Sequence, residues 1–143
     1  MSKFYITTAI AYVNAKPHIG FAMEIIQADV VARYHRLKGD DTFYITGTDE
    51  YGSKMRDTAK DLGITNRELA DRNSAKVIKL AKDLGLSNER FIRTTEDVHT
   101  RTVQKLWKRL ADAGDIYKKK YSGLYCIGCE VFVADKDLVD GQC

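Results

Sequence analysis

The stretch AYVNAKPHIGF places a histidine and a glycine directly after the only proline of the chain. The fixed φ of Pro17 suits a first helical position, so we expect a helix to begin at Pro17 or His18. The N–H groups at the start of such a helix are unpaired and carry a partial positive charge, which favours a bound phosphate. The members of this motif are Ala11, Tyr12, Val13, Asn14, Ala15, Lys16, Pro17, His18, Ile19, Gly20 and Phe21.

Two residues of the motif are candidates for phosphate chemistry. His18 is a candidate catalytic donor to a phosphate oxygen whose charge grows during attack at phosphorus. Gly20 has no Cβ, so a flat or bulky ligand has room against the first helical turn. A plain N-terminal turn with a solvated histidine is the alternative interpretation, because His-x-Gly at a helix start is a common pattern.

A second candidate group surrounds the segment GTDEYG, residues 47–52. Asp49 is a candidate partner for the ammonium group of a substrate, and Tyr12 is a candidate wall for an apolar pocket beside it. An aspartate after Gly-Thr also favours an Asx-type turn, in which its carboxylate accepts local N–H groups. For Tyr12 the alternative is ordinary packing.

The three cysteines of the chain, Cys126, Cys129 and Cys143, lie in its last 18 residues. C-x-x-C spacing directs two sulfurs at one ion, and structural zinc takes four ligands. A redox C-x-x-C pair and unmetallated thiols are the alternatives. We expect the fourth zinc ligand to lie outside this chain, because the histidines belong to the preceding part of the sequence: His18, His35 and His99.

The elements that position these residues alternate between strand and helix. β-branched and aromatic residues predict strands over 4–10, 41–50 and 90–94, and helices fill the intervals. In an open parallel sheet, ligands bind beyond the carboxyl ends of the strands. We therefore expect an α/β fold in which residues 11–20 and 47–52 face each other across one crevice.

Helix signals divide the remaining sequence. The first helix carries apolar residues at helical spacing up to Gly39, and a second runs from residue 53 to Gly63. Thr65 and Glu68 form a capping-box pattern that opens a third helix, whose buried face is predicted at Val77, Leu80, Ala81 and Leu84. Thr95 is the candidate N-cap of a fourth helix, which ends near Gly114.

Composition sets further bounds on the class of protein. The 143 residues are 44% hydrophobic and 30% charged, with a net charge of +3, which identifies no polyanion partner. No apolar run approaches the roughly 20 residues that cross a bilayer, so we expect no membrane partner and a cytoplasmic location. The composition changes near Ile116, where lysines, tyrosines, glycines and the cysteines replace helical periodicity. This change predicts one unit over 1–115 and a second over 116–143.

Six stretches together resemble the N-terminal part of the methionyl-tRNA synthetases, a family of class I aminoacyl-tRNA synthetases. The resemblance covers essentially the whole chain and is far more specific than His-Ile-Gly alone. The stretches are TTAIAYVNAKPHIGF, QADVVARYHRLKGDD, YITGTDEYGSK, FIRTTEDVH, GDIYKKKYSGLYCIGCE and LVDGQC.

The resemblance implies a Rossmann-like parallel sheet with crossover helices, followed by the start of a zinc-knuckle connective insertion. It also implies activation of methionine with ATP, as its Mg²⁺ complex, and transfer to the 3′ end of a tRNA. His18, Gly20 and Phe21 would bind ATP, and Tyr12 and Asp49 would bind methionine. Structural Zn²⁺ would bind to Cys126, Cys129 and Cys143. We expect the 143 residues of this chain alone to have little or no activity.

Three positions depart from the family pattern. Phe21 stands where the family has a second histidine, Ala11 where it often has proline, and Tyr51 where histidine is common. Phe21 matters most, because a phenyl ring can pack against adenine but cannot donate a hydrogen bond to a phosphate.

Two other functions are compatible with the sequence. The first is a synthetase for another apolar amino acid, or a nucleotidyltransferase, on the same fold. The second is a non-catalytic module that binds tRNA or a partner chain through its basic residues and zinc knuckle. The run 118–120 and the basic residues of 101–109 would meet the acceptor end of a tRNA, but a solvated helix face is the favoured interpretation, because Lys105, Lys108 and Arg109 avoid the apolar stripe of their helix.

Overall fold

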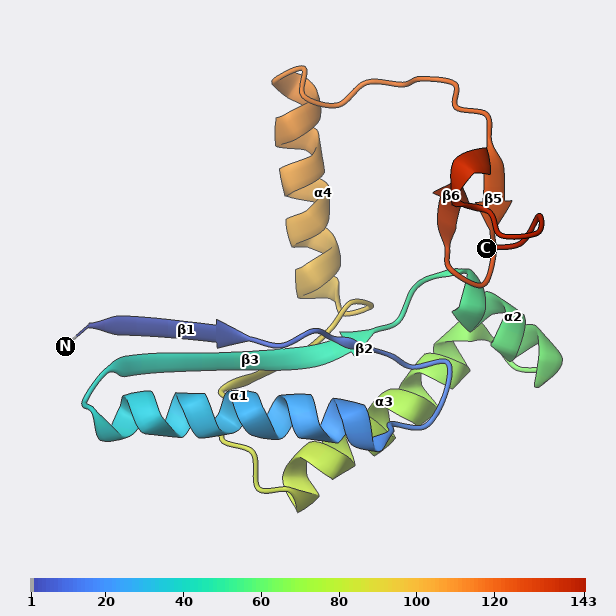
Figure 1. The fold of residues 1–143 in the computed structure, drawn as a ribbon. Helices are drawn as coiled ribbons and strands as arrows, with labels where there is room; N and C mark the ends of the chain where they lie inside the picture. Colours follow the sequence, from blue (N-terminus) through green and yellow to red (C-terminus); the bar gives the residue numbers. More distant parts are fainter. Residues whose placement is uncertain (1) are drawn as a thin grey trace. The chain divides into compact units, whose positions relative to one another are not determined.

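A parallel sheet organises the N-terminal part of the computed structural model, which describes residues 2–143 (Figure 1). Its strands are β1 (Lys3–Thr7), β2 (Ala11–Tyr12), β3 (Asp41–Asp49) and β4 (Arg90–Arg93). β3 is central, because it pairs with β1 and β2 along one edge and with β4 along the other, and every pairing is parallel. β1 and β2 thus follow one another along the same edge of β3.

Helices make the crossover connections that parallel strands require. α1 (Ile19–Leu37) connects the first edge to β3 and packs along β1 and β3 (Figure 1). α2 (Ser53–Asp61) and α3 (Asn66–Asp83) form the connection from β3 to β4 along the chain, and they pack against each other. The predicted α/β fold with a Rossmann-like parallel sheet is therefore confirmed.

Two apolar clusters fix these helices in place. In the smaller one, Ala28 and Ala32 of α1 lie against Tyr44 of β3, whose hydroxyl donates to the Ile25 carbonyl at 3.0 Å. Burial raises the pKa of Tyr44 to about 12. The larger cluster joins the loop after β2 to three helices through Val13, Phe21, Ile25, Met55, Ala59, Leu69, Ala70 and Val77.

The apolar stripe that predicted the first helix does not pack into this core. Small residues of the opposite face, with Phe21 and Ile25, are buried instead. A helix that packs closely on a sheet needs small side chains at the contact, and Ala28 and Ala32 supply them. Among the stripe residues only Ala22 is buried, and the exposed ones are Ile19, Met23, Ile26, Val30, Tyr34 and Leu37.

The first predicted strand ends earlier than expected. β1 stops at Thr7, and the chain rejoins β3 only as β2, so the expected loop begins after Tyr12. Between the two strands, the N–H of Ala9 donates to the Glu24 carboxylate at 2.7 Å instead of to the sheet.

The backbone of the Gly-Thr-Asp segment was expected to form a turn at the end of the strand, but it continues the strand. Gly47, Thr48 and Asp49 are the last residues of β3. A Cβ at Gly47 would lie 2.2 Å from the carbonyl oxygen of Ile92. Glycine is therefore required here for the close approach of β4, and not for a turn.

Local signals at the helix ends are mostly confirmed. α2 is followed by Gly63 at φ 66°, and Thr65 and Glu68 form the predicted capping box of α3. Val77 and Ala81 are buried as expected, whereas Leu84 is exposed because it lies at the C-cap. Thr95 was predicted to cap the fourth helix; its hydroxyl donates to Glu50 instead, and the helix begins at Asp97.

The chain divides into two compact units, Met1–Thr102 and Val103–Cys143. The division falls within α4 (Asp97–Asp112), which has no buried residue. The second unit also contains an antiparallel hairpin of β5 (Leu124–Cys126) and β6 (Val131–Val133), followed by the short helix η1 (Asp135–Asp137). The predicted boundary after residue 115 stays a prediction. Among the residues that the structure describes, no helix combines the length and the apolar composition of a membrane-spanning segment.

Candidate functional site

A cavity of about 340 Å³ lies where β2 ends and α1 begins. Its lining includes Tyr12, the turn from Asn14 to His18, Gly20 and Phe21. These residues come from the predicted motif, and they meet at the edge of the sheet where the carboxyl ends of the strands lie. The volume falls in the range of ligand pockets, about 300 to 1,000 Å³.

His18 is the N-cap of α1. Its Nδ1 accepts the N–H groups of Gly20, at 3.1 Å, and Phe21, at 3.3 Å. An imidazole nitrogen that accepts carries no proton, so the neutral ring holds its proton on Nε2. His18 therefore has one nitrogen committed to the helix and the other able to donate to a ligand.

This cap corrects two expectations about the start of α1. The helix begins at Ile19, so Pro17 precedes it by two residues. The N–H groups of Gly20 and Phe21 were expected to be unpaired and directed at a ligand, but they are bonded to His18. The first turn therefore presents the imidazole to the cavity in place of these two backbone donors.

Gly20 makes room for this arrangement. A Cβ at residue 20 would lie 3.1 Å from both Cε1 and Nδ1 of His18, which is closer than most carbon contacts. The missing side chain thus accommodates the capping imidazole. Room for a ligand against the same turn stays a prediction.

Phe21 belongs mainly to the core. The residue is 6% exposed and packs in the cluster that contains Val13 and Ile25. It also contributes to the cavity lining, so part of its surface borders the space beside His18. A contact with adenine would use only that part.

Tyr12 and Asp49 are neighbours in the sheet. They are paired in the parallel register of β2 and β3, and the N–H of Val13 donates to the Asp49 carbonyl at 3.3 Å. Tyr12 is 46% exposed and lines the cavity that contains His18, whereas Asp49 is not part of that lining. Tyr12 therefore borders His18 through the cavity lining and Asp49 through the strand pairing. Residues 11–20 and 47–52 were expected to face each other across one crevice, but residues 50–52 line a different cavity.

The Asp49 carboxylate accepts a local hydrogen bond. Its Oδ1 accepts the N–H of Tyr51 at 3.3 Å, which is the Asx-type contact considered above. A carboxylate has about four acceptor positions, so this bond leaves capacity for an ammonium group. The turn-forming and ligand-binding interpretations of Asp49 are compatible.

Two polar residues that support the motif were not predicted. Glu24 holds the turn between β1 and β2 through Ala9 and lines the cavity. Asn73 of α3 is 4% exposed and donates to the carbonyl of Val13 at 2.6 Å. Asn73 interrupts the buried stripe of its helix, and that interruption was the signal available in the sequence.

Glu50 is the most completely buried charge near this edge, and its role was also missed. Its side chain has no exposed surface and pairs with Arg93, with Nε and Oε1 2.6 Å apart. Burial raises the pKa of Glu50, but hydrogen bonds from Arg93, Ser74, Thr95 and Thr48 outweigh it, so the net pKa lies below the usual value. The carboxylate is therefore ionised, and no local sequence pattern identifies its distant partners.

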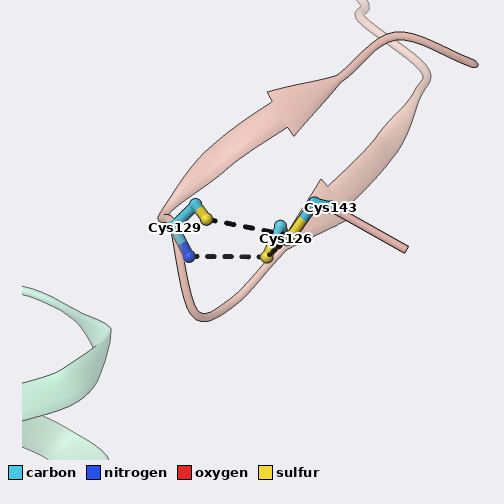
Figure 2. Close-up of side chains that lie close together, drawn as sticks. All are labelled: Cys126, Cys129 and Cys143. Carbon is cyan, nitrogen blue, oxygen red and sulfur yellow. Dashed lines mark hydrogen bonds between the residues drawn. The ribbon is translucent and has the colours of Figure 1, made fainter. Parts of the chain in front are cut away.

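The second candidate site is the cysteine cluster of the hairpin (Figure 2). Cys126 ends β5, Cys129 follows the tight turn, and Cys143 returns beside them. The Sγ atoms of the three residues lie within 4.8 Å of one another, with Cys129 and Cys143 3.8 Å apart. Sulfurs on a tetrahedral zinc ion lie about 3.8 Å apart, as Cys129 and Cys143 do, whereas Cys126 and Cys143 are 2.8 Å apart. Three thiols are donors that structural zinc takes, so the donor set fits zinc in chemistry.

The thiols also influence one another electrostatically. Donation from the Cys143 thiol and from the N–H of Cys129 lowers the pKa of Cys126 to about 7. The same bond raises the pKa of Cys143 to about 11, because its proton is held against the Cys126 sulfur. A lowered thiol pKa is a property of both metal-ligating thiolates and redox C-x-x-C pairs, so it is compatible with both interpretations of the cluster.

Comparisons with known proteins point to one family. The family model described as tRNA synthetases class I (M) matches residues 4–143. The methionine–tRNA ligase of Rhizobium meliloti is 50% identical over 136 residues, which are 95% of this chain and 26% of the ligase. The ligase of Thermotoga maritima is 44% identical over 137 residues, 96% of this chain and 22% of the ligase.

A solved structure has the same fold. The Mycobacterium tuberculosis methionyl-tRNA synthetase in complex with methionyl-adenylate is 44% identical and superposes with a TM-score of 0.92. The match covers 99% of this chain and 28% of that chain. The chain thus spans about a quarter of the length of the curated relatives it matches.

Proposed function

Because this chain belongs to the class I (M) tRNA synthetases, we propose that the protein containing it activates methionine with ATP and transfers the methionyl group to a tRNA. In the first step, a methionine carboxylate oxygen attacks the α-phosphorus of ATP, which forms methionyl-adenylate and releases pyrophosphate. In the second, a hydroxyl at the 3′ end of the tRNA attacks the methionyl carbonyl and releases AMP. One observation carries this proposal: Tyr12 both lines the cavity beside His18 and pairs with Asp49.

For methionine, we propose that Tyr12 walls the side-chain pocket and Asp49 binds the α-ammonium. Paired residues of parallel strands have side chains on the same face of the sheet, so the ring and the carboxylate border one region. The Mycobacterium tuberculosis enzyme that superposes over 99% of this chain was solved in complex with methionyl-adenylate, which supports methionine as the amino acid.

For ATP, supplied as its Mg²⁺ complex, we propose that His18, Gly20 and Phe21 form the binding turn. The Nδ1 of His18 is held by the N-cap bonds, which directs Nε2–H away from the helix. A fixed donor needs little reorganisation when charge grows on a phosphate oxygen during attack. His18 would thus act as an electrostatic catalyst and not as a general base.

For the hairpin, we propose that Cys126, Cys129 and Cys143 hold a structural zinc ion, with a fourth ligand from outside this chain. Bound zinc would fix the geometry of a unit in which most side chains are exposed. No step of the proposed reaction depends on the metal. The tRNA and ATP substrates support a cytoplasmic location.

Thermal-shift measurements on the full-length protein test the substrate. We expect methionine to raise the melting temperature, while leucine and isoleucine leave it unchanged, since the pocket must accept a thioether side chain. Stabilisation by leucine or isoleucine alone would favour a synthetase of different specificity. Methionine-dependent exchange of pyrophosphate into ATP then tests the first chemical step.

A further inference from the structure

The carboxylate of Glu50 connects the ends of β3 and β4 to helix α3. Oε1 accepts the Nε of Arg93 at 2.6 Å, the hydroxyl of Ser74 at 2.5 Å and that of Thr48 at 2.9 Å. Oε2 accepts the Nη2 of Arg93 at 3.0 Å and the hydroxyl of Thr95. All of its partners are donors, so the buried charge is fully compensated.

The backbone of Glu50 is fixed as well. Its N–H donates to the hydroxyl of Thr94 at 2.9 Å, and Thr94 in turn donates its own N–H to the carbonyl of Thr48. Thr94 is itself 7% exposed. The end of β3 is therefore held to the end of β4 by both side-chain and backbone bonds.

Asp49 lies between Thr48 and Glu50, the two residues that are bonded to Thr94. Thr48 and Glu50 are two residues apart and bond to each other, so their side chains share one face of the chain. Successive side chains of a strand alternate between faces, so Asp49 is directed to the other face. In the plane of the sheet, the carbonyl of Asp49 accepts the N–H of Val13, and Asp49 pairs with Tyr12 in the strand register.

We propose that Glu50, acting with Arg93, is a positioning residue that sets the orientation of the Asp49 carboxylate for the ammonium group of the amino acid. This inference rests on the proposed function of Asp49. Arg93 is itself held from its outer side by Asp71 at 2.5 Å, so the guanidinium is fixed by two carboxylates. The Glu50–Arg93 pair orders the backbone at Asp49 before the substrate binds, so substrate binding does not have to supply the free energy of ordering it.

The test compares two ligands on the full-length protein: methionine and its desamino analogue 4-(methylsulfanyl)butanoate, which lacks the ammonium group. For Glu50→Gln we expect the Kd of methionine to rise about tenfold, the order of one hydrogen bond to a charged group. The Kd of the analogue, measured by ligand-observed NMR, should stay within about twofold, because it does not use Asp49. Equal weakening of both ligands, or of neither, would overturn the inference.

Glu89→Gln is the matched control. Glu89 also pairs with an arginine, Arg36 at 2.6 Å, and bonds the backbone of β3 through the N–H of Tyr44. Like Glu50, Glu89 is a carboxylate that pairs with an arginine beside β3, but it lies at Tyr44 and not next to Asp49. We expect this substitution to leave the Kd of methionine unchanged, so a general loosening of the sheet is distinguished from positioning.

Asp49→Asn separates the inference from the function on which it rests. If this variant binds methionine unchanged, the ammonium assignment itself fails. If it weakens methionine while Glu50→Gln does not, only the positioning role fails. The double variant should bind no more weakly than Asp49→Asn alone. Thr95→Ala removes one donor to Glu50 and should give a smaller effect of the same pattern if Glu50→Gln does not fold.

Discussion

Tyr12 lies directly opposite Asp49 in the register of β2 and β3, and the two strands are bonded again one residue on, from Val13 to Asp49. An aromatic ring and a carboxylate thus border the same part of the sheet edge. These groups match the two ends of a methionine molecule, because the thioether is apolar and the ammonium is cationic. The pairing of β2 with β3 sets the distance between Tyr12 and Asp49, so this distance does not depend on the conformation of a loop.

Tyr12→Ala should therefore weaken methionine binding by about tenfold, since it removes the buried contact of one aromatic ring. The KM for ATP should change by less than about twofold, because the ring is not among the groups proposed for ATP. Equilibrium binding of methionine and the ATP dependence of pyrophosphate exchange measure the two effects. Tyr12→Phe keeps the ring and should keep most of the affinity; equal losses in both variants would contradict a wall role.

Glu50 should make the stability of the chain depend on pH. Its pKa is lower in the folded than in the unfolded state, so its contribution is present above the unfolded value and is lost as pH falls through the folded value. Arg93 pairs with Glu50 and also with Asp71, and Arg93 stays charged throughout. Urea unfolding of wild type and Glu50→Gln should show a difference that is largest near pH 7 and shrinks toward pH 3.

A difference that stays constant over this pH range would show that Glu50 acts through packing and not through its charge. The same titration of Ser74→Ala serves as a control. That variant removes one donor but keeps the carboxylate, so the pH dependence should be reduced and not abolished.

The parts of the fold that were predictable are those set by local chemistry. The capping box of Thr65 and Glu68 uses residues three apart, and Gly63 ends α2 through its own backbone conformation. The C-x-x-C spacing of Cys126 and Cys129 likewise brings two sulfurs together over one tight turn. These patterns need no knowledge of the rest of the chain.

The buried face of α1 was not predictable in this way. Its stripe of large apolar residues is exposed, and Ala28, Ala32 and Asp29 are buried. Asp29 is acceptable there because it accepts the N–H and hydroxyl of Ser87, each at 2.6 Å. Ser87, which bonds to Asp29, and Arg93, which pairs with Glu50, lie far away in sequence, so periodicity contains no sign of them.

Gly47→Ala should destabilise the chain by about 3 kcal/mol, the upper part of the range for overpacking. The new Cβ would lie 2.2 Å from the carbonyl oxygen and 2.5 Å from Cγ2 of Ile92, and the backbone atom cannot move without disturbing β4. Gly39→Ala is the control: no atom lies within 4 Å of its Cβ, and only the strain of φ +85° should cost about 1 kcal/mol. Chemical unfolding measures both, and equal losses would contradict the steric account.

Zinc analysis of the full-length protein should find one ion per chain that depends on the hairpin cysteines. Cys126→Ser should reduce the zinc content to near zero, because a hydroxyl does not replace a thiolate and the remaining thiols cannot complete the shell. His99→Ala, a change outside the hairpin, should keep the metal. Full zinc content in Cys126→Ser, measured by atomic absorption after dialysis, would reject the site.

His18 combines two roles that substitution can separate. Its Nδ1 caps α1 at 3.1 Å from the Gly20 nitrogen, whereas its Nε2 is proposed to donate to phosphate. His18→Asn keeps a good N-cap and should leave the free energy of unfolding within about 0.5 kcal/mol, while His18→Ala should lose about 1 kcal/mol. Alanine has no side-chain donor, so His18→Ala should slow pyrophosphate exchange in the full-length protein by about 100-fold or more, whereas the Nδ2–H of asparagine partly replaces Nε2–H and His18→Asn should slow it less. An alanine variant with wild-type exchange would show that His18 serves the helix alone.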